Sequence, residues 1–148
     1  MNVQLGEPKY IGIDLGTTYS AMAWLNPQGV PQTILNCENE TTTPSVVMFE
    51  LMENGMAGNV VVGTQAKYAA IENEHLIADN IKRDTGQPHY HKKINDRQYS
   101  PTELSALILK KLRQCAQQQL GMIAGAVITV PAYFNESQRQ ATVAAGRW

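Results

Sequence analysis

The sequence has no long hydrophobic run: nowhere do about 18 apolar residues follow one another, so it predicts no membrane-spanning helix. Its first residues also lack the charged start and apolar stretch of a secretory signal. Twelve basic and thirteen acidic residues leave a net charge of -1, which gives no electrostatic case for binding nucleic acid or an acidic membrane surface. We therefore expect a cytoplasmic protein whose partners are neither nucleic acids nor membranes.

Cysteine is also scarce. Cys37 and Cys115 are the only two, they lie far apart in the chain, and no CxxC spacing occurs. This pattern lacks the spacing of a zinc knuckle and does not indicate a disulfide framework. The sequence therefore predicts two reduced structural thiols.

The chain is nevertheless long and apolar enough to build a core. With 148 residues, 43% of them hydrophobic, it should fold as one domain or as one lobe of a larger one. Strands are predicted at residues 10–14, 20–25 and 30–35, which form a β-meander, and at 44–49 and 60–62; a short helix follows Gly63, and residues 86–96 form a polar loop.

The clearest predicted element is a helix from Pro101 to Leu120. Ser100 can cap this helix, Glu103 completes a capping box, and Gly121 supplies a stop. Its predicted core face is an apolar stripe of helical period, made of Leu104, Leu107, Ile108, Leu112, Cys115 and Leu120.

Two further elements follow this helix. Residues 126–130 are continuously apolar and predict an interior strand covered on both faces. Asn135 can cap a last helix that runs toward Gly146, because Gln138 stands three residues further on. Strands first, then an alternation of helix and strand, indicate an α/β layered lobe.

The strongest chemical pattern lies at residues 11–20. An apolar strand there delivers Asp14 into a glycine turn at Gly16, which is lined by the hydroxyls of Thr17 and Thr18. Such a turn can present backbone N–H groups and hydroxyls to phosphate oxygens, while the carboxylate faces a hydrated Mg2+. The same spacing also fits a plain hairpin whose threonines favour strand geometry, and spacing alone does not separate the two.

Other phosphate-binding motifs are not found in the sequence. Gly58 and Gly63 have the glycine separation of a P-loop, but Thr64 and Gln65 follow where a lysine and a hydroxyl residue are required. No GxGxxG opens a helix either. We therefore expect neither a P-loop nor a Rossmann site.

Residues 12–18 resemble the first phosphate loop of the superfamily that contains actin, the sugar kinases and the heat-shock chaperones. Three later segments, 42–47, 79–83 and 130–142, resemble the DnaK-type seventy-kilodalton heat-shock protein family in sequence, order and approximate spacing. The resemblance covers nearly the whole chain. It implies an α/β fold of the actin-like ATPase (ribonuclease H-like) kind, a mixed sheet with an N-terminal β-meander and flanking helices.

The resemblance also implies roles for single residues and the cofactors ATP or ADP and Mg2+. Asp14 matches the carboxylate that lies near Mg2+, through water, and near the attacking water, and Lys82 matches the catalytic lysine. Pro131 and Arg139 match the pair proposed in the family to relay nucleotide state allosterically toward the peptide-binding domain. The residues that match the loop contacting the ATP phosphates are Gly16, Thr17, Thr18 and Tyr19.

The length of the chain limits which parts of the family's protein it can contain. Residues 1–148 match a truncated nucleotide-binding domain, its first lobe, without the second lobe and the peptide-binding domain of the family. We therefore expect a fragment of an ATP-dependent molecular chaperone whose own ATP binding is weak or absent and whose own hydrolysis is negligible. The intact parent would act on unfolded client peptides with a J-domain co-chaperone and a nucleotide-exchange factor. Exposed apolar area, to which Trp148 adds, predicts self-association of the fragment.

Two other functions stay open at this point. A sugar or acetate kinase lobe shares the first phosphate loop, although it has no reason to carry the pattern at residues 130–142. A non-enzymatic binding or regulatory module would keep the fold without the activity. A partner that binds without nucleotide would favour this last alternative.

Overall fold

The computed structural model describes residues 6–147, so Trp148 and the first five residues, on which two of the expectations above partly rest, lie outside it. No helix within the described part has the length and hydropathy needed to cross a bilayer. The elements are β1 (Lys9–Leu15), β2 (Tyr19–Leu25), β3 (Pro31–Ile34), β4 (Thr42–Pro44), β5 (Val47–Leu51), β6 (Ala57–Val62), α1 (Thr64–Ala69), η1 (Glu74–Leu76), β7 (Ile77–Ala78), η2 (Ile81–Asp84), α2 (Pro101–Leu120), β8 (Ile123–Thr129) and α3 (Glu136–Gly146).

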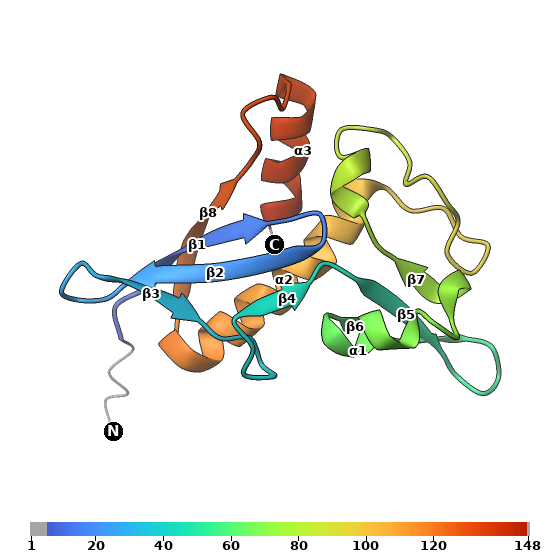
Figure 1. Ribbon diagram of the computed structural model, residues 1–148, viewed down its shortest axis with the longest axis horizontal. Coiled ribbons are helices and arrows are strands. Elements are labelled where there is room, and N and C mark those ends of the chain that lie inside the picture. The colour runs from blue at the N-terminus through green and yellow to red at the C-terminus, as the bar shows by residue number, and fades with distance from the viewer. Residues whose placement is uncertain (1–5, 148) are drawn as a thin grey trace.

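A five-stranded mixed sheet forms one half of the molecule (Figure 1). Its strand order is β3-β2-β1-β8, and β4 pairs with the part of β2 that β3 leaves uncovered. Strands β1, β2 and β3 form the predicted antiparallel meander, whereas β8 lies parallel to β1. The predicted fold class, α/β with a mixed sheet, an N-terminal meander and flanking helices, is confirmed.

A smaller antiparallel sheet, in the order β6-β5-β7, lies beside the first and carries α1 (Figure 1). The single strand predicted at residues 44–49 is wrong in detail, because β4 ends at Pro44 and β5 begins at Val47. Between them, the amide of Ser45 donates to the carbonyl of Thr18 at 2.9 Å, while the carbonyl of Val46 accepts from Gly63 at 3.0 Å. The chain therefore leaves one sheet and enters the other at this point.

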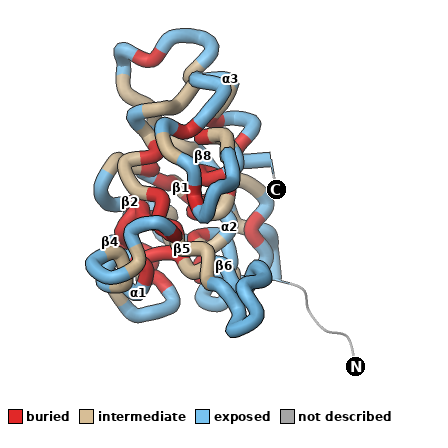
Figure 2. The backbone as a smooth tube through the Cα atoms, turned by 90° about the vertical axis from the view of Figure 1, so that its right-hand side faces the viewer, coloured by how far each residue is buried: buried red, intermediate tan, exposed pale blue. Residues whose placement is uncertain are grey.

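Helix α2 packs along the core that both sheets share, and the buried stretches gather around it and around β1 and β2 (Figure 2). The predicted capping box is present, since the Ser100 hydroxyl accepts from the amide of Glu103 and the Glu103 carboxylate accepts from the amide of Ser100. Both predicted ends of the helix, including Gly121, are confirmed. Of the predicted stripe, Leu107 and Leu120 are only partly buried and the other four residues are buried. The buried face also includes residues outside the stripe: Pro101, Ser105, Ala106, Leu109 and Ala116.

Strand β8 is not the doubly covered interior strand that its apolar run predicted. It forms the edge of the described sheet and pairs with β1 alone, and the side chain of Val127 is 72% exposed. A continuous apolar run indicates which residues suit a covered strand, but it does not supply the covering elements. The exposed face of β8 is therefore an apolar surface of the described molecule.

The predicted reduced thiols are wrong as well. Cys37 and Cys115 form a disulfide, with their Cα atoms 5.1 Å apart. The sequence separation of the two cysteines hid this pairing, because the connection between β3 and β4 folds back onto α2.

The loop predicted at residues 86–96 contains no helix or strand, yet it is not wholly polar: Tyr90 and Ile94 are each only 1% exposed.

Candidate functional site

The four segments that carry the chemical patterns meet where β1 turns into β2. Strand β1 alternates, so that Ile13 and Leu15 face the core while Asp14 points to the opposite, exposed face. In the parallel register Asp14 lies next to Thr129, whose hydroxyl donates to its carboxylate at 3.0 Å. The carboxylate thus stands at the carboxyl ends of two parallel strands, where open α/β sheets bind their ligands.

The turn after β1 has a conformation that only glycine fits at its first position. A Cβ atom on Gly16 would lie 2.0 Å from the carbonyl oxygen of Tyr19, which is part of the backbone and cannot swing aside. The turn is also held from outside, because the hydroxyl of Ser45 donates to the carbonyl of Gly16 at 2.8 Å. The Ser45 hydroxyl proton is therefore engaged with the Gly16 carbonyl. In the 2.9 Å contact between the hydroxyls of Ser20 and Ser45, the donor is then Ser20.

Thr17 and Thr18 line a small hollow beside this turn. The hollow measures about 150 Å3, with room for several water molecules. Its other walls come from segments far along the chain and include Ser45, Val46, Lys67, Ala70, Asp79 and Asn80. Three of the four family-like segments therefore share one hollow.

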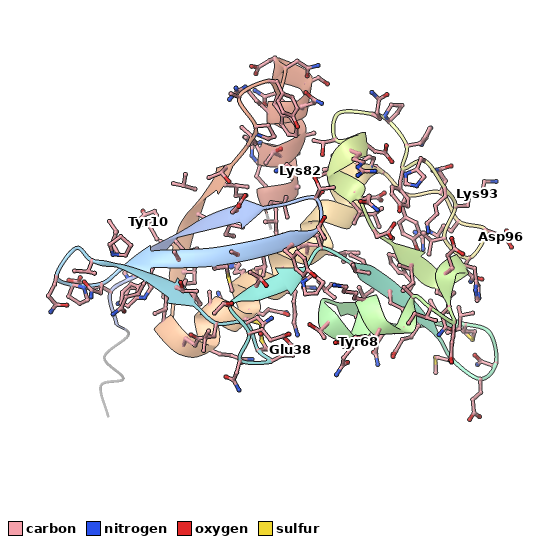
Figure 3. The ribbon with its side chains drawn as sticks, viewed as in Figure 1. Tyr10, Glu38, Tyr68, Lys82, Lys93 and Asp96 are labelled. Carbon is pink, nitrogen blue, oxygen red and sulfur yellow. A yellow bond between two sulfur atoms is a disulfide. The ribbon has the colours of Figure 1, made fainter. Side chains whose placement is uncertain are left out.

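Lys82 reaches the same turn from η2 (Figure 3). Its ammonium donates to the carbonyl of Leu15 at 2.6 Å, one residue before the glycine turn. Burial lowers the pKa of Lys82, and the negative charge of Asp14 acts in the opposite direction. The structure thus brings together the two residues predicted to be catalytic.

Tyr19, the last residue of the predicted phosphate loop, points toward α1. Its hydroxyl accepts from the ammonium of Lys67 at 2.5 Å, and that nitrogen lies 4.7 Å from the centre of the tyrosine ring. The hydrogen bond with Tyr19 raises the pKa of Lys67. The loop therefore has a cation on each side, Lys82 from η2 and Lys67 from α1.

Pro131 and Arg139, the predicted relay pair, are linked through Phe134. The amide of Phe134 donates to the carbonyl of Pro131 at 3.0 Å, and the guanidinium of Arg139 donates to the carbonyl of Phe134 at 3.2 Å. The ring of Phe134 is buried and lies 5.9 Å from the ammonium of Lys82. A continuous set of contacts therefore connects Lys82 with the exposed surface at Arg139.

The backbone just before η2 is fastened by Tyr90. Its hydroxyl donates to the carbonyl of Asp79 at 2.8 Å and accepts from the amide of the same residue at 3.1 Å. Burial raises the pKa of Tyr90 to about 12. Asn80, the next residue, has the left-handed conformation with φ 51°, and η2 starts directly after it. Tyr90 thus helps to fix the starting point of the segment that carries Lys82.

The donor set fits a phosphate group better than a free metal ion. Within residues 6–147, no three His, Cys, Asp or Glu side chains gather as a metal site around Asp14 or elsewhere. Mg2+ commonly uses one or two carboxylates together with water and substrate phosphates. Asp14 is therefore suited to a hydrated Mg2+ that arrives with a phosphate ligand.

Sequence reasoning missed several residues of this site. Thr129, Lys67 and Tyr90 were not singled out, and their contacts depend on strand register and on loop packing that local patterns do not encode. Ser45 and Phe134 lie inside the family-like segments 42–47 and 130–142. Their position inside these segments is the sequence signal by which both could have been identified as site residues.

Comparison with known proteins agrees with this arrangement. The family model described as Hsp70 protein matches residues 10–148. The chain is 48% identical over 137 residues to the chaperone protein DnaK of Thermosipho melanesiensis and 47% identical to that of Thermotoga petrophila. In both cases the match covers 92% of this chain and 22% of the relative, so the chain spans about a fifth of their length.

These matches support the heat-shock chaperone family over the two alternatives left open by the sequence, a sugar or acetate kinase lobe and a non-enzymatic module. They also agree with the mixed sheet and flanking helices of the actin-like ATPase fold. The glycine turn, the exposed carboxylate before it and the lysine beside it occupy the same matched region. The family model covers nearly all of the chain, and the chain belongs to the Hsp70 family.

Proposed function

We propose that residues 1–148 form the first lobe of the nucleotide-binding domain of an ATP-dependent molecular chaperone, with ATP or ADP and Mg2+ as its cofactors. The observation that carries the proposal is the meeting of Asp14, the Gly16 turn and Lys82 at one hairpin tip. Family membership supports it, because the relatives that match are named chaperone protein DnaK.

In the proposed site, Gly16, Thr17, Thr18 and Tyr19 hold the phosphates. Oriented backbone amides and hydroxyls in such a turn favour anionic oxygens. Mg2+, when bound, would neutralise phosphate charge, and Asp14 would hold its water shell. Lys82 would orient the attacking water and stabilise charge that builds on the transferring phosphoryl group. Its partial burial strengthens that interaction, since less water screens it.

By itself this lobe should bind nucleotide weakly. The family places ATP between two lobes, so this chain would supply only part of the phosphate, metal and base contacts. Each charged hydrogen bond that is missing typically removes about 1.5 to 3 kcal/mol of binding free energy. We therefore propose that hydrolysis belongs to a longer parent and that this chain alone turns over negligible ATP.

The proposal also covers the relay residues, the partners and the self-association of this lobe. We propose that Pro131 and Arg139 relay the nucleotide state, and the contacts of both with Phe134, beside Lys82, support this. In the parent, the partners would be unfolded client peptides, a J-domain co-chaperone and a nucleotide-exchange factor, in the cytoplasm. The exposed edge strand β8 supports self-association of this lobe when it stands alone.

Calorimetric titration of the chain with Mg-ATP tests the proposal. We expect weak but saturable binding, weakened at least about tenfold by Asp14→Asn or Lys82→Ala, which corresponds to about 1.4 kcal/mol. Lys93→Ala is the matched control, because it removes an equal charge from an exposed loop position away from the hairpin tip (Figure 3). Equal weakening by Lys82→Ala and Lys93→Ala, with no weakening by Asp14→Asn, would mean unspecific attraction of the phosphates to positive charge. No saturable binding would contradict a phosphate site in this lobe.

A further inference from the structure

The connection between β3 and β4 is tied to α2 by three contacts in a row. Cys37 forms the disulfide with Cys115, Glu38 forms an ion pair of 2.9 Å with Lys111, and the Gln119 amide donates to the carbonyl of Leu35. On α2 these partners are spaced four residues apart, which places them on one helix face. Glu38 lies in this connection below the sheet (Figure 3).

The same connection supports the phosphate loop. Next to Cys37, the buried side chain of Asn36 donates to the hydroxyl of Thr43 at 3.1 Å. Two residues beyond Thr43 stands Ser45, whose hydroxyl and amide hold the carbonyls of Gly16 and Thr18. A short, mostly buried path therefore joins the disulfide to the glycine turn.

The two sulfurs lie in different surroundings. Cys115 is fully buried in the core, whereas Cys37 is exposed and lines an open hollow together with Lys111. A thiolate in solution can reach the exposed Cys37 sulfur, whereas the core covers the Cys115 sulfur, and access helps to decide which sulfur of a disulfide is attacked. In the cytoplasm, the proposed compartment of this protein, disulfides are usually transient and redox-sensing rather than permanent.

We propose that the Cys37–Cys115 disulfide is a redox-responsive link that holds the phosphate loop in place, and that dithiol reductants open it at Cys37. The reductant thiolate attacks the Cys37 sulfur, the disulfide breaks, and its electron pair leaves with the Cys115 sulfur, which takes up a proton. The second thiolate of the reductant then displaces Cys37, which also takes up a proton. The reductant becomes a disulfide, and the protein gains two electrons and two protons.

Amide hydrogen exchange of the whole chain, oxidised or treated with dithiothreitol, tests this link. Mass measurement first establishes that the oxidised chain is lighter than the reduced chain by two hydrogen atoms. Reduction should then speed exchange of the Ser45 amide, which donates to Thr18, at least about tenfold more than exchange of the Arg139 amide in α3. Cys37→Ser is the matched control: it should exchange like the reduced chain and not respond to dithiothreitol.

Three results would overturn the inference: no disulfide in the oxidised chain, no change at Ser45 when both thiols are free, or an equal change at Ser45 and Arg139. An equal change at both amides would mean that the disulfide stabilises the whole fold and not the phosphate loop in particular. A second readout rests on the proposed nucleotide site: Mg-ATP should bind at least about threefold more weakly after reduction. Absence of binding in both states would contradict the proposed function, while the exchange result would still decide the redox link.

Discussion

The two turns at the ends of β2 are built in opposite ways. The turn between β2 and β3 is self-contained: the side-chain oxygen of Asn26 accepts from the amides of Gln28 at 3.0 Å and Val30 at 2.9 Å, and Gly29 has φ 75°. The turn between β1 and β2 takes its contacts from far away, since Ser45 and Lys82 lie 29 and 67 positions from the carbonyls that they hold.

This difference separates a turn that closes a hairpin from a turn that forms a site. In the first, all partners lie within a few residues, so local sequence suffices to specify the shape. In the second, the turn is held by distant segments that must fold against it first. Functional loops placed by a rigid scaffold are a general feature of proteins.

Replacing the glycine of each turn should give the largest contrast. Gly16→Ala places a Cβ atom 2.0 Å from a backbone oxygen, so the turn must rearrange, at a cost of about 2–4 kcal/mol of unfolding free energy. A Cβ on Gly29 meets open space, and Gly29→Ala should cost only the left-handed conformation, about 1–2 kcal/mol. Urea denaturation followed by circular dichroism measures both. Equal losses would show that the site turn is no more constrained than the other.

Tyr90→Phe tests how far the support of the site turn extends. The substitution leaves the amide and carbonyl of Asp79 without their partner and should cost about 1–3 kcal/mol at neutral pH. The pKa of Tyr90 lies near 12 in the folded chain and 10.0 is its ordinary value, so the folded state keeps a proton that the unfolded state loses. The stabilisation is therefore complete below pH 10 and is lost between pH 10 and 12, by on the order of 2 kcal/mol.

The measurement for Tyr90 is the unfolding free energy across pH 8 to 12 for the wild type, Tyr90→Phe and Tyr133→Phe. Tyr133 is 82% exposed, so its variant is the matched control and should follow the wild type. Tyr90→Phe should lack the extra decline above pH 10. If all three curves run in parallel, the buried hydroxyl does not hold the segment before Lys82.

The contrast between the turns also explains what the sequence could predict. Both capped helices were predicted with their ends, because Ser100 with Glu103 and Asn135 with Gln138 act within one helical turn. The β-meander was predicted from short strand-like runs at residues 10–14, 20–25 and 30–35 that turn residues separate. These features depend on near neighbours, which a single sequence displays directly.

What the sequence predicted wrongly or missed concerns contacts between distant segments. The Cys37–Cys115 disulfide, which was predicted as two free thiols, and the hydrogen bond between Thr129 and Asp14, which was missed, arise only when the distant segments have folded together. The exposure of β8 depends on which elements cover it, not on its own apolar run. For the site, residue types at the hairpin tip and the family resemblance named Asp14 and Lys82, but their closeness through the carbonyl of Leu15 required the fold.

The smallest predicted effects come from the hydrogen-bonding side chains that belong to each turn. Ser45→Ala leaves the carbonyl of Gly16 and the hydroxyl of Ser20 without a buried partner, which should cost about 1–2 kcal/mol. Asn26→Ala exposes two amides that water can satisfy, so about 0.5 kcal/mol is expected.

Backbone amide chemical shifts distinguish the two cases better than stability does. Ser45→Ala should shift amides in both sheets, because Ser45 stands where the chain passes from one sheet to the other, and it should weaken Mg-ATP binding. Asn26→Ala should shift only residues 25–31 and leave binding unchanged, since its partners lie within its own turn. If the shifts of Ser45→Ala also stayed within a few residues, the hairpin tip would keep its shape without distant support, and the two turns would not differ in the way proposed.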